Sequence, residues 1–177
     1  MVCPSGARKS RLRGVTAPES SSKAKPRIRL ATRADIPALS ALRVALFLEL
    51  GAVVPSEAGQ FLQACHGGFE AMYDASSGIA WVAETDDGAL VGGLTLLFFA
   101  RLPSPQNHAG VEGYVVGVYT EPEWRGRGVA TALMSASLEA ARQRGLARIR
   151  LHATEKGRRV YASQGFRLRN DEMELVL

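Results

Sequence analysis

One stretch in the middle of the chain, from Glu112 to Leu138, narrows the possible folds more than any other part of the sequence. Its first part, from Gly113 to Tyr119, consists of β-branched, aromatic and glycine residues, a composition typical of a central strand that is covered on both faces. Pro122 ends the strand pattern because it has no N–H to donate. From Val129 onward the apolar residues recur with helical spacing. The stretch therefore predicts a buried strand, a short loop and a helix.

The loop between the predicted strand and helix has a composition that suits a phosphate group. The first amides of a helix have no intrahelical partner and carry the positive end of the helix dipole, so they attract anions. Glycine lets a phosphate approach closely because it has no Cβ. Two arginines in the same loop add positive charge. We therefore predict a site for an anion with more than one charge, formed by Arg125, Gly126, Arg127, Gly128, Val129, Ala130 and Thr131.

Other glycine-rich loops fit this sequence less well. A P-loop needs Gly-Lys-Ser/Thr at the start of its helix, and the chain contains no such tripeptide. A dinucleotide fingerprint needs Gly or Ala where Thr131 stands. Arg-Gly-Arg-Gly also occurs in RNA-binding tracts of low complexity, but here it occurs once, between two periodic segments. The interpretation that competes with a phosphate site is a structural turn with surface arginines.

The spacing of Arg125, Gly128 and Ala130 resembles motif A of the GCN5-related N-acetyltransferases (GNAT), whose pattern is Arg/Gln-x-x-Gly-x-Gly/Ala. In that family the loop wraps the pyrophosphate of acetyl-CoA, so the resemblance implies that acetyl-CoA is the cofactor. The family also uses a bulge in the preceding strand to polarise the thioester carbonyl and to contact the pantetheine arm. The corresponding residues of this chain are Val118, Tyr119 and Thr120.

A second stretch, from Arg159 to Phe166, resembles GNAT motif B, which ends Leu-Tyr-x-x-x-Gly-Phe. Tyr161, Gly165 and Phe166 match this pattern. The resemblance implies that Tyr161 lies beside the cofactor and protonates the thiolate leaving group, since the pKa of a phenol, ~10, is close to the ~8.5 of a thiol. The alternative is that Tyr161 only packs on the cofactor or on the core.

Two residues near motif B depart from the family pattern. Thr154 stands where family members often have Asn, and Gly157 stands where they often have Ala. The usual Asn amide contacts the pantetheine arm of the cofactor. Because a threonine hydroxyl also donates and accepts hydrogen bonds, we retain Thr154 as a predicted cofactor contact.

The acceptor amine must lose a proton before it attacks the thioester. An amine with the pKa of lysine, ~10.4, is almost entirely protonated at pH 7, so a general base is expected. Glu112, at the start of the central strand, is the first candidate, and Glu84, at the end of an earlier strand, is the second. The alternative for each is a solvated carboxylate at a strand end.

The histidines and cysteines give a weaker signal. We expect surface or packing roles for the three histidines, His66, His108 and His152. No pair of them has the spacing of metal ligands, and neither cysteine adds one, so no metal is predicted. Cys3 and Cys65 do not form a disulfide framework. The sequence therefore predicts a cytoplasmic protein.

The order of predicted elements and the resemblance, which covers residues 27–177, imply the same fold class. This is an α/β fold: a single GNAT domain with a mixed, mostly antiparallel twisted sheet of six to seven strands, flanked by about four helices. Strands are predicted at 28–31, 79–84, 90–100, 113–119 and 147–152, with one or two closing strands in 166–177. Helices are predicted up to Gly51, from 56 or 57 to about 73, from Val129 to Gly145, and over 156–163.

The net charge of +5 is located at the N-terminus of the chain. Residues 1–29 contain eight Lys or Arg and one Glu, which leaves 14 basic and 16 acidic residues for the remainder. We therefore predict that residues 1–26 form a disordered basic extension, and that nucleic acid is not a partner of the folded domain. No apolar run approaches the ~20 residues of a membrane span, so no membrane association is predicted.

Taken with the resemblance, these observations predict an N-acetyltransferase that moves an acetyl group from acetyl-CoA to a primary amine by direct nucleophilic attack. The substrate is a small-molecule or peptide amine, whose identity the sequence leaves open. Two other interpretations also stay open: an acyltransferase that uses another acyl-CoA, and a non-catalytic acyl-CoA-binding sensor or interaction module. A homodimer would follow the habit of the family.

Overall fold

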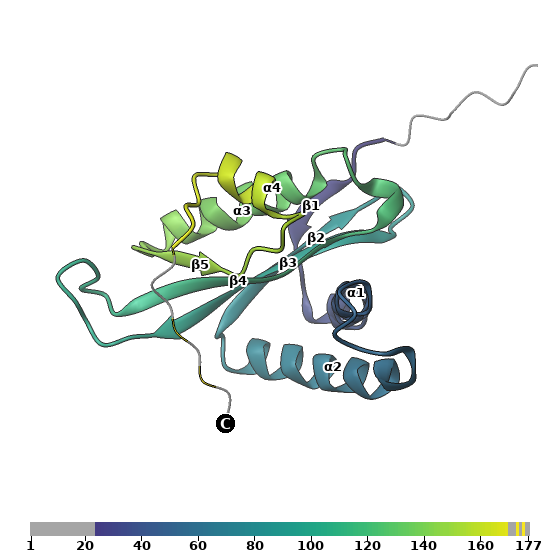
Figure 1. Ribbon diagram of the computed structural model, residues 1–177, viewed down its shortest axis with the longest axis horizontal. Coiled ribbons are helices and arrows are strands. Elements are labelled where there is room, and N and C mark those ends of the chain that lie inside the picture. Colours follow the sequence, from purple (N-terminus) through teal and green to yellow (C-terminus); the bar gives the residue numbers. More distant parts are fainter. Residues whose placement is uncertain (1–23, 170–172, 174, 176–177) are drawn as a thin grey trace, which may run out of the picture.

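The structure is a computed structural model that describes residues 24–169, 173 and 175 (Figure 1). Its sheet has five strands in the order β1-β2-β3-β4-β5, and every pair is antiparallel except β4–β5, which is parallel. The strands are β1 (Arg27–Leu30), β2 (Gly78–Glu84), β3 (Leu90–Ala100), β4 (Val111–Thr120) and β5 (Ile149–Leu151). The helices are α1 (Ile36–Glu49), α2 (Ala58–Asp74), α3 (Val129–Gln143) and α4 (Arg158–Ser163).

Local sequence signals explain several of the element boundaries. Thr32 and Asp35 form a capping box just before α1, and Gly51 ends this helical segment with a φ of +67°. The β2–β3 hairpin turns at Gly88, which has a φ of +84°. Gly67 and Gly68 do not interrupt α2, because its apolar residues pack on the sheet and on α1.

The two faces of the sheet have separate hydrophobic clusters. Figure 1 shows α1 and α2 on one face and α3 and α4 on the other. Alternate residues of a strand point to opposite faces, and β2 follows this rule. Val82 packs in the cluster of α1 and α2, whereas Trp81 packs in the cluster of α3. The sheet is thus a central layer, which leaves its edges and strand ends for function.

Two irregularities open the sheet at the end of β4. The pairing register with β3 shifts between Gly93, which pairs with Tyr119, and Thr95, which pairs with Val116. At this bulge Gly117 has a φ of +63°. On its other side β4 pairs with β5 only from Gly113 to Val115, and the two strands then part. The backbone of the last third of β4 is therefore unpaired toward β5.

The mixed, mostly antiparallel sheet and the four helices confirm most of the predicted fold, but the prediction of six to seven strands was wrong. The described residues form five strands, and no strand includes residues 166–169, 173 or 175. Phe166 turns back onto Tyr161, with 6.2 Å between ring centroids. Leu168 is 74% exposed and Met173 is 101% exposed. Leu168, Met173 and Leu175 are thus exposed, whereas Phe166 packs against the α3 cluster without forming a strand.

The remaining differences lie at element ends and outside the described residues. The fifth strand is shorter than predicted, and α4 begins at Arg158 rather than at residue 156. Residues 1–23 of the predicted basic extension lie outside the described residues, so the extension stays a prediction. No helix among the described residues combines the length and the apolar character that a membrane span requires.

Candidate functional site

A cleft of about 630 Å³ lies where β4 and β5 part, between the end of β4, the start of α3 and the segment from Thr154 to Tyr161. We call it the fork cleft. It brings together all the predicted cofactor-binding residues except Arg127. Those that line it are Val118, Tyr119, Thr120, Arg125, Gly126, Gly128, Val129, Ala130, Thr131, Thr154 and Tyr161.

The N-terminus of α3 is open toward this cleft. Gly126 and Gly128 have φ values of +73° and +77°, a conformation that other residues adopt only with strain. A Cβ at either position would meet no atom within 4 Å apart from chain neighbours, so no other described residue packs against these two glycines. No side chain caps the helix, and its first turn contains no acidic residue. The positive end of the helix dipole is therefore available to an anion.

The two arginines of the loop have different surroundings. The Nε of Arg125 donates to the carbonyl oxygen of Thr120 at 2.9 Å, and its two Nη atoms bind Glu49 at the end of α1. Lys156 also contacts Glu49, with 3.1 Å from Nζ to Oε1. These cations, Arg125 foremost, lower the pKa of Glu49. Arg127 instead lies over the ring of Trp124, with 5.2 Å from Cζ to the ring centroid.

Tyr161 lies across the cleft from the α3 terminus, on α4. Burial raises the pKa of its phenol, so the hydroxyl stays protonated at neutral pH. The two departures from the family pattern accommodate this side chain. A Cβ at Gly157 would lie 2.7 Å from the Tyr161 ring, so glycine makes room for it. The Oγ1 of Thr154 accepts a hydrogen bond from the Gly157 amide at 3.2 Å, which fixes the turn before α4.

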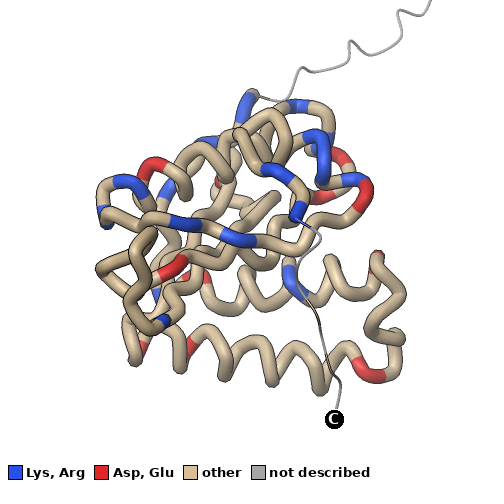
Figure 2. Tube along the Cα trace, turned by 60° about the vertical axis from the view of Figure 1, so that its left-hand side comes forward, with Lys and Arg blue, Asp and Glu red and all other residues tan. Residues whose placement is uncertain are grey.

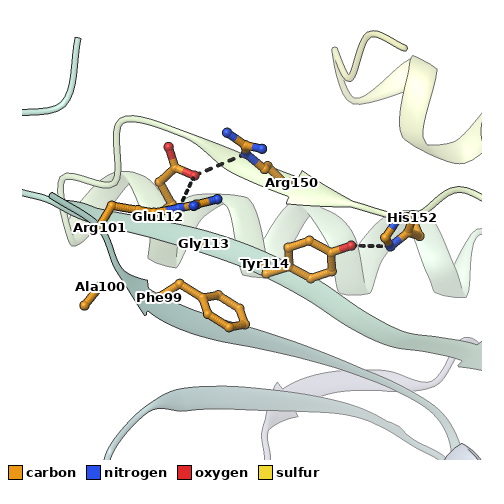
Figure 3. A pocket seen from close by; sticks show the side chains of 8 residues that line it. All are labelled: Phe99, Ala100, Arg101, Glu112, Gly113, Tyr114, Arg150 and His152. Atoms are coloured by element: carbon orange, nitrogen blue, oxygen red, sulfur yellow. Dashed lines mark hydrogen bonds and ion pairs between the residues drawn. The ribbon is translucent and has the colours of Figure 1, made fainter. Parts of the chain in front are cut away.

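A second pocket, of about 370 Å³, lies beside the paired part of β4 and β5 (Figure 3). We call it the arginine pocket; it is lined by Phe99, Ala100, Arg101, Glu112, Gly113, Tyr114, Arg150 and His152. Glu112 is 7% exposed and forms ion pairs with three arginines: Arg150 at 3.1 Å, Arg148 at 3.4 Å and Arg101 at 3.5 Å. Figure 3 also shows the hydrogen bond between the Tyr114 hydroxyl and Nδ1 of His152.

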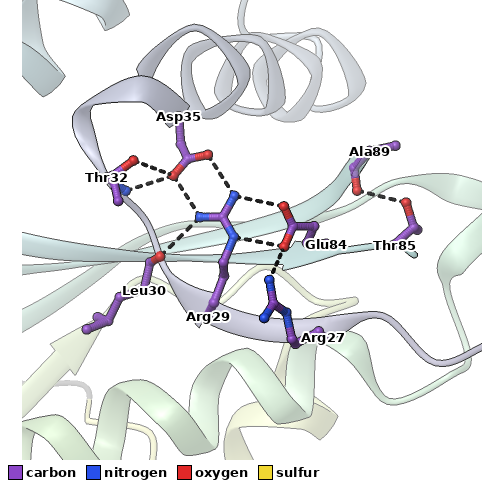
Figure 4. Close-up of polar contacts among 8 residues, drawn as sticks. All are labelled: Arg27, Arg29, Leu30, Thr32, Asp35, Glu84, Thr85 and Ala89. Carbon is purple, nitrogen blue, oxygen red and sulfur yellow. Dashed lines mark hydrogen bonds and ion pairs between the residues drawn. The ribbon is translucent and has the colours of Figure 1, made fainter. Parts of the chain in front are cut away.

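The structure does not bring the two predicted general bases to the fork cleft. Glu112 lies six residues before Val118 on β4, about 20 Å along an extended strand, and lines the arginine pocket. Glu84 ends β2, two strands away from β4, and is bound to Arg27 and Arg29 (Figure 4). Arg29 first and then Arg27 lower the pKa of Glu84 to about 2, which makes its carboxylate a weak base.

The basic and acidic residues of the domain lie in different parts of the chain, and its net charge does not show this. Residues 125–169 contain eleven Lys or Arg and two Asp or Glu, whereas residues 30–124 contain three and eleven. In Figure 2 the two long helices at the bottom of the view, α1 and α2, have few charged residues, and the basic residues gather above them. Both pockets therefore take walls from the basic part of the chain.

Several site residues were not found by sequence reasoning. Glu49 belongs to no motif, and only the fold brings it to Arg125 and Lys156. The excess of Lys and Arg after residue 124 was a usable signal for the anion-binding half of the domain. Among the described residues, no three His, Cys, Asp or Glu side chains lie close enough together to hold a metal ion.

Comparison with known proteins agrees with this geometry. The sequence model of the acetyltransferase (GNAT) family matches residues 53–166. A GCN5-related N-acetyltransferase from Ralstonia eutropha JMP134 is 26% identical, with a TM-score of 0.74 over 85% of this chain and 97% of that protein. A predicted acetyltransferase from Clostridium acetobutylicum, whose structure contains acetyl-CoA, is 26% identical, with a TM-score of 0.73 over 85% and 95%. No protein with a curated function matches the chain in sequence.

Proposed function

The chain belongs to the GNAT acetyltransferase family, and from this premise we propose that it moves an acetyl group from acetyl-CoA to a primary amine by direct nucleophilic attack. The observation that supports this most strongly is the open N-terminus of α3, which faces the same cleft as the phenol of Tyr161. One end of this cleft suits a diphosphate, and the other suits a leaving group that must gain a proton.

The fork cleft fits acetyl-CoA in three respects. Uncapped helix amides and two glycines without neighbouring side chains suit the pyrophosphate. Arg125 and Lys156 add positive charge at the same place. The backbone at Val118 and Tyr119, which has no partner in β5, offers hydrogen bonds to an extended pantetheine arm. A neighbour of the same fold contains acetyl-CoA, which is consistent with this assignment.

The residues of the cleft have distinct roles in the proposed reaction. When bound, acetyl-CoA supplies a thioester whose carbon–sulfur bond is exchanged for a carbon–nitrogen bond, and the proton that nitrogen loses balances the departing thiolate. The backbone N–H of Val118, at the bulge of β4, donates to the carbonyl oxygen as negative charge develops there. Tyr161 keeps its proton at neutral pH because its pKa is raised, and it gives this proton to sulfur.

A pair of variants tests the two ends of the cleft. Gly128→Glu places a carboxylate where the phosphates bind, so calorimetry should show acetyl-CoA affinity reduced at least about 100-fold. Tyr161→Phe removes only the proton donor, so the rate of thiol release should fall about 100-fold while affinity for acetyl-CoA changes little.

Matched controls separate these effects from a loss of stability. Gly145 has a φ of +68° and open space around its Cβ position, so Gly145→Glu introduces the same backbone strain away from the cleft. Tyr73, whose pKa burial also raises, provides Tyr73→Phe. Both controls should bind acetyl-CoA as the wild type does. Unchanged affinity in Gly128→Glu would contradict the cofactor site, and acetyl-CoA binding without thiol release for any amine would favour a sensor.

A further inference from the structure

We propose that His152 is the general base of the reaction, and that its Nε2 takes the proton which the acceptor amine must lose before it attacks the thioester. The inference rests on the acetyltransferase function proposed above, and it replaces the surface or packing role that the sequence suggested for this residue. It depends on three features of His152: its position where β4 and β5 part, the face of the sheet to which its side chain points, and its contact with Tyr114.

His152 stands at the point where the two strands part. The last residue of β5, Leu151, pairs with Val115, and His152 follows it directly. If the register continued, His152 would face Val116, which lies two residues, or about 7 Å, before Val118. An amine nitrogen about 3 Å from the imidazole and about 3 Å from the thioester carbon spans a similar distance. The imidazole is therefore within reach of an amine that attacks a thioester held at Val118.

The side chain of His152 points to the face of the sheet opposite Tyr161. Leu151 and Tyr161 both pack with the α3 cluster, and successive residues of an extended chain point to opposite faces. The contact of His152 with Tyr114 agrees with this orientation, because Val115, the neighbour of Tyr114, also packs with the α3 cluster. His152 is thus on the face that α1 and α2 cover (Figure 1). The proton acceptor and the proton donor lie on different sides of the thioester.

A hydrogen bond fixes the orientation of the imidazole. Nδ1 of His152 is bonded to the hydroxyl of Tyr114, and the two rings have 5.9 Å between their centroids (Figure 3). Phe99 meets the Tyr114 ring edge to face, also with 5.9 Å between centroids, so the three rings form one wall. When Nδ1–H donates to the phenolic oxygen, Nε2 keeps its lone pair and can accept a proton. Tyr114 is therefore a positioning residue for His152.

The carboxylates around the two pockets suit this step less well. Glu112 lies farther from the fork, where three arginines surround it. Glu49 lies on α1, and Arg125 lowers the pKa of its carboxyl, which makes it a weaker base. Glu155 lines the fork cleft from the turn before α4, the helix that presents Tyr161. The experiment below includes Glu155 as the competing base.

The proposed step balances its protons and electrons. The acceptor enters as an ammonium, and Nε2 of His152 takes one proton from it, which the exposed imidazole releases to water. The free amine forms the carbon–nitrogen bond as the carbon–sulfur bond breaks, and Tyr161 gives a proton to sulfur. The nitrogen of the new amide loses its second proton to water, and water returns one proton to Tyr161. Each turnover therefore releases one proton.

The test compares amines of different basicity on the full-length protein with acetyl-CoA. The panel contains ethylamine, phenethylamine and a lysine-containing peptide. The first two are paired with analogues that carry fluorine on the carbon next to the aminomethyl group, which makes the amine far less basic and removes its need for a base. His152→Ala should reduce thiol release at pH 7 about 100-fold for the basic amines, but less than about threefold for their fluorinated partners. Added imidazole should restore the rate of this variant at least about tenfold, because the position is exposed.

Three further variants locate the effect. His152→Gln keeps a hydrogen-bonding side chain without a basic nitrogen, so it should be as slow as His152→Ala. Tyr114→Phe removes only the hydrogen bond, so it should lower the rate about tenfold, with no gain from added imidazole. His108→Ala is the matched control, because His108 is exposed in the loop between β3 and β4, outside the residues that line the two pockets. Affinity for acetyl-CoA should stay within about twofold in all of them.

The outcomes separate this inference from the proposed function. Equal losses for basic and fluorinated amines, full activity in His152→Gln, no rescue by imidazole, or an amine-dependent loss in Glu155→Gln in place of His152→Ala would each overturn the assignment of His152. If acetyl-CoA binds and His152→Ala releases thiol as fast as the wild type, the acetyltransferase proposal stands without this base. If the wild type binds acetyl-CoA but releases thiol with no amine of the panel, both proposals fail.

Discussion

Two ion clusters lie on different strands of the same sheet, and they differ in the length of their contacts. In the first, Arg29 binds Asp35 at 2.8 Å and Glu84 at 3.0 Å, and Arg27 binds Glu84 at 2.7 Å (Figure 4). Two basic and two acidic side chains cancel. In the second, the arginine pocket, three arginines meet the single carboxylate of Glu112 at distances between 3.1 and 3.5 Å.

This difference distinguishes a structural cluster from a binding site. The contacts of the first cluster are short, and Asp35 also accepts a hydrogen bond from the Thr32 amide at 2.7 Å, so charge and geometry are both satisfied. Such a network fixes the start of α1 against β1 and β2. The second cluster has longer contacts, and it opens into a pocket. A cluster whose short contacts are all satisfied has little to gain from a ligand.

The largest effect on stability is expected when the cluster of Arg27, Arg29, Asp35 and Glu84 loses Arg29. Arg29→Met leaves Asp35 and Glu84 without the guanidinium that joins them, and the free energy of unfolding should fall by about 3 kcal/mol in urea titrations. Arg33→Met is the matched control, because Arg33 makes exposed ion pairs with Glu70 and Asp74. It should lower the free energy of unfolding far less than Arg29→Met does, because exposed ion pairs are screened by solvent.

The same measurement on the arginine pocket tests the comparison itself. Arg101→Met should change the free energy of unfolding by less than about 1 kcal/mol, because Glu112 keeps Arg148 and Arg150. If Arg101→Met destabilises the protein as much as Arg29→Met does, the second cluster is also structural, and the contrast disappears.

Lowering the pH should weaken the cluster of Arg29, Asp35 and Glu84 over a range of pH values. Arg29 holds the pKa of Asp35 well below its usual range, and Arg29 and Arg27 lower the pKa of Glu84 from 4.5 to about 2. A carboxyl whose pKa is lower in the folded state stabilises the protein above its unfolded pKa, and this contribution is lost as pH falls through the folded value. Melting temperature should therefore drop between about pH 4 and pH 2. Arg29→Met should flatten this dependence, and equal slopes in wild type and variant would contradict the assignment.

The features that the sequence predicted are those set by the conformation of the backbone. Gly126 and Gly128 need their left-handed conformations, and Val129 starts a helix whose amides point into the cleft, so residue type and spacing are directly informative. The strands and helices could also be predicted, because burial imposes a period on apolar residues. The predicted closing strand was wrong because an apolar residue such as Leu168 need not pack on the sheet, and its side chain is exposed.

The parts that the sequence did not predict are those made by side chains from distant segments. Arg101, Glu112 and Arg150 come from the end of β3, the start of β4 and β5, and only the sheet register brings them together. Glu112 illustrates the difficulty. Its position at the start of the central strand suggested a general base, but the fold surrounds it with arginines. No local pattern distinguishes those two roles.

Glu112→Gln separates the two roles, with a smaller effect than the loss of Arg29. If Glu112 only holds the arginines in place, kcat and acetyl-CoA affinity should be nearly unchanged. If it is the general base, kcat should fall about 100-fold at neutral pH and recover as pH rises. We expect the first result in steady-state assays across pH. Glu139→Gln, at an exposed position on α3, is the control and should change neither parameter.

The smallest effect is expected at a third group of charges, at the mouth of the fork cleft. There Glu49 binds both Arg125 and Lys156, so one carboxylate occupies two cations that phosphates would use. Glu49→Gln should therefore increase the affinity for acetyl-CoA about threefold at low salt, as measured by calorimetry. The gain should shrink at high salt, since exposed charges are screened.

The sign of this change depends on how Arg125 is held once Glu49 is neutral. Its Nε donates to the carbonyl oxygen of Thr120, and its guanidinium lies 5.4 Å from the centroid of the Tyr119 ring, so two contacts that do not involve Glu49 keep it beside the cleft. Removing the carboxylate then takes away repulsion without releasing the cation. A weaker affinity in Glu49→Gln would mean that the carboxylate is needed to aim Arg125 at the ligand. In that case the balance of charge would not by itself distinguish the clusters that bind anions from those that only hold the fold together.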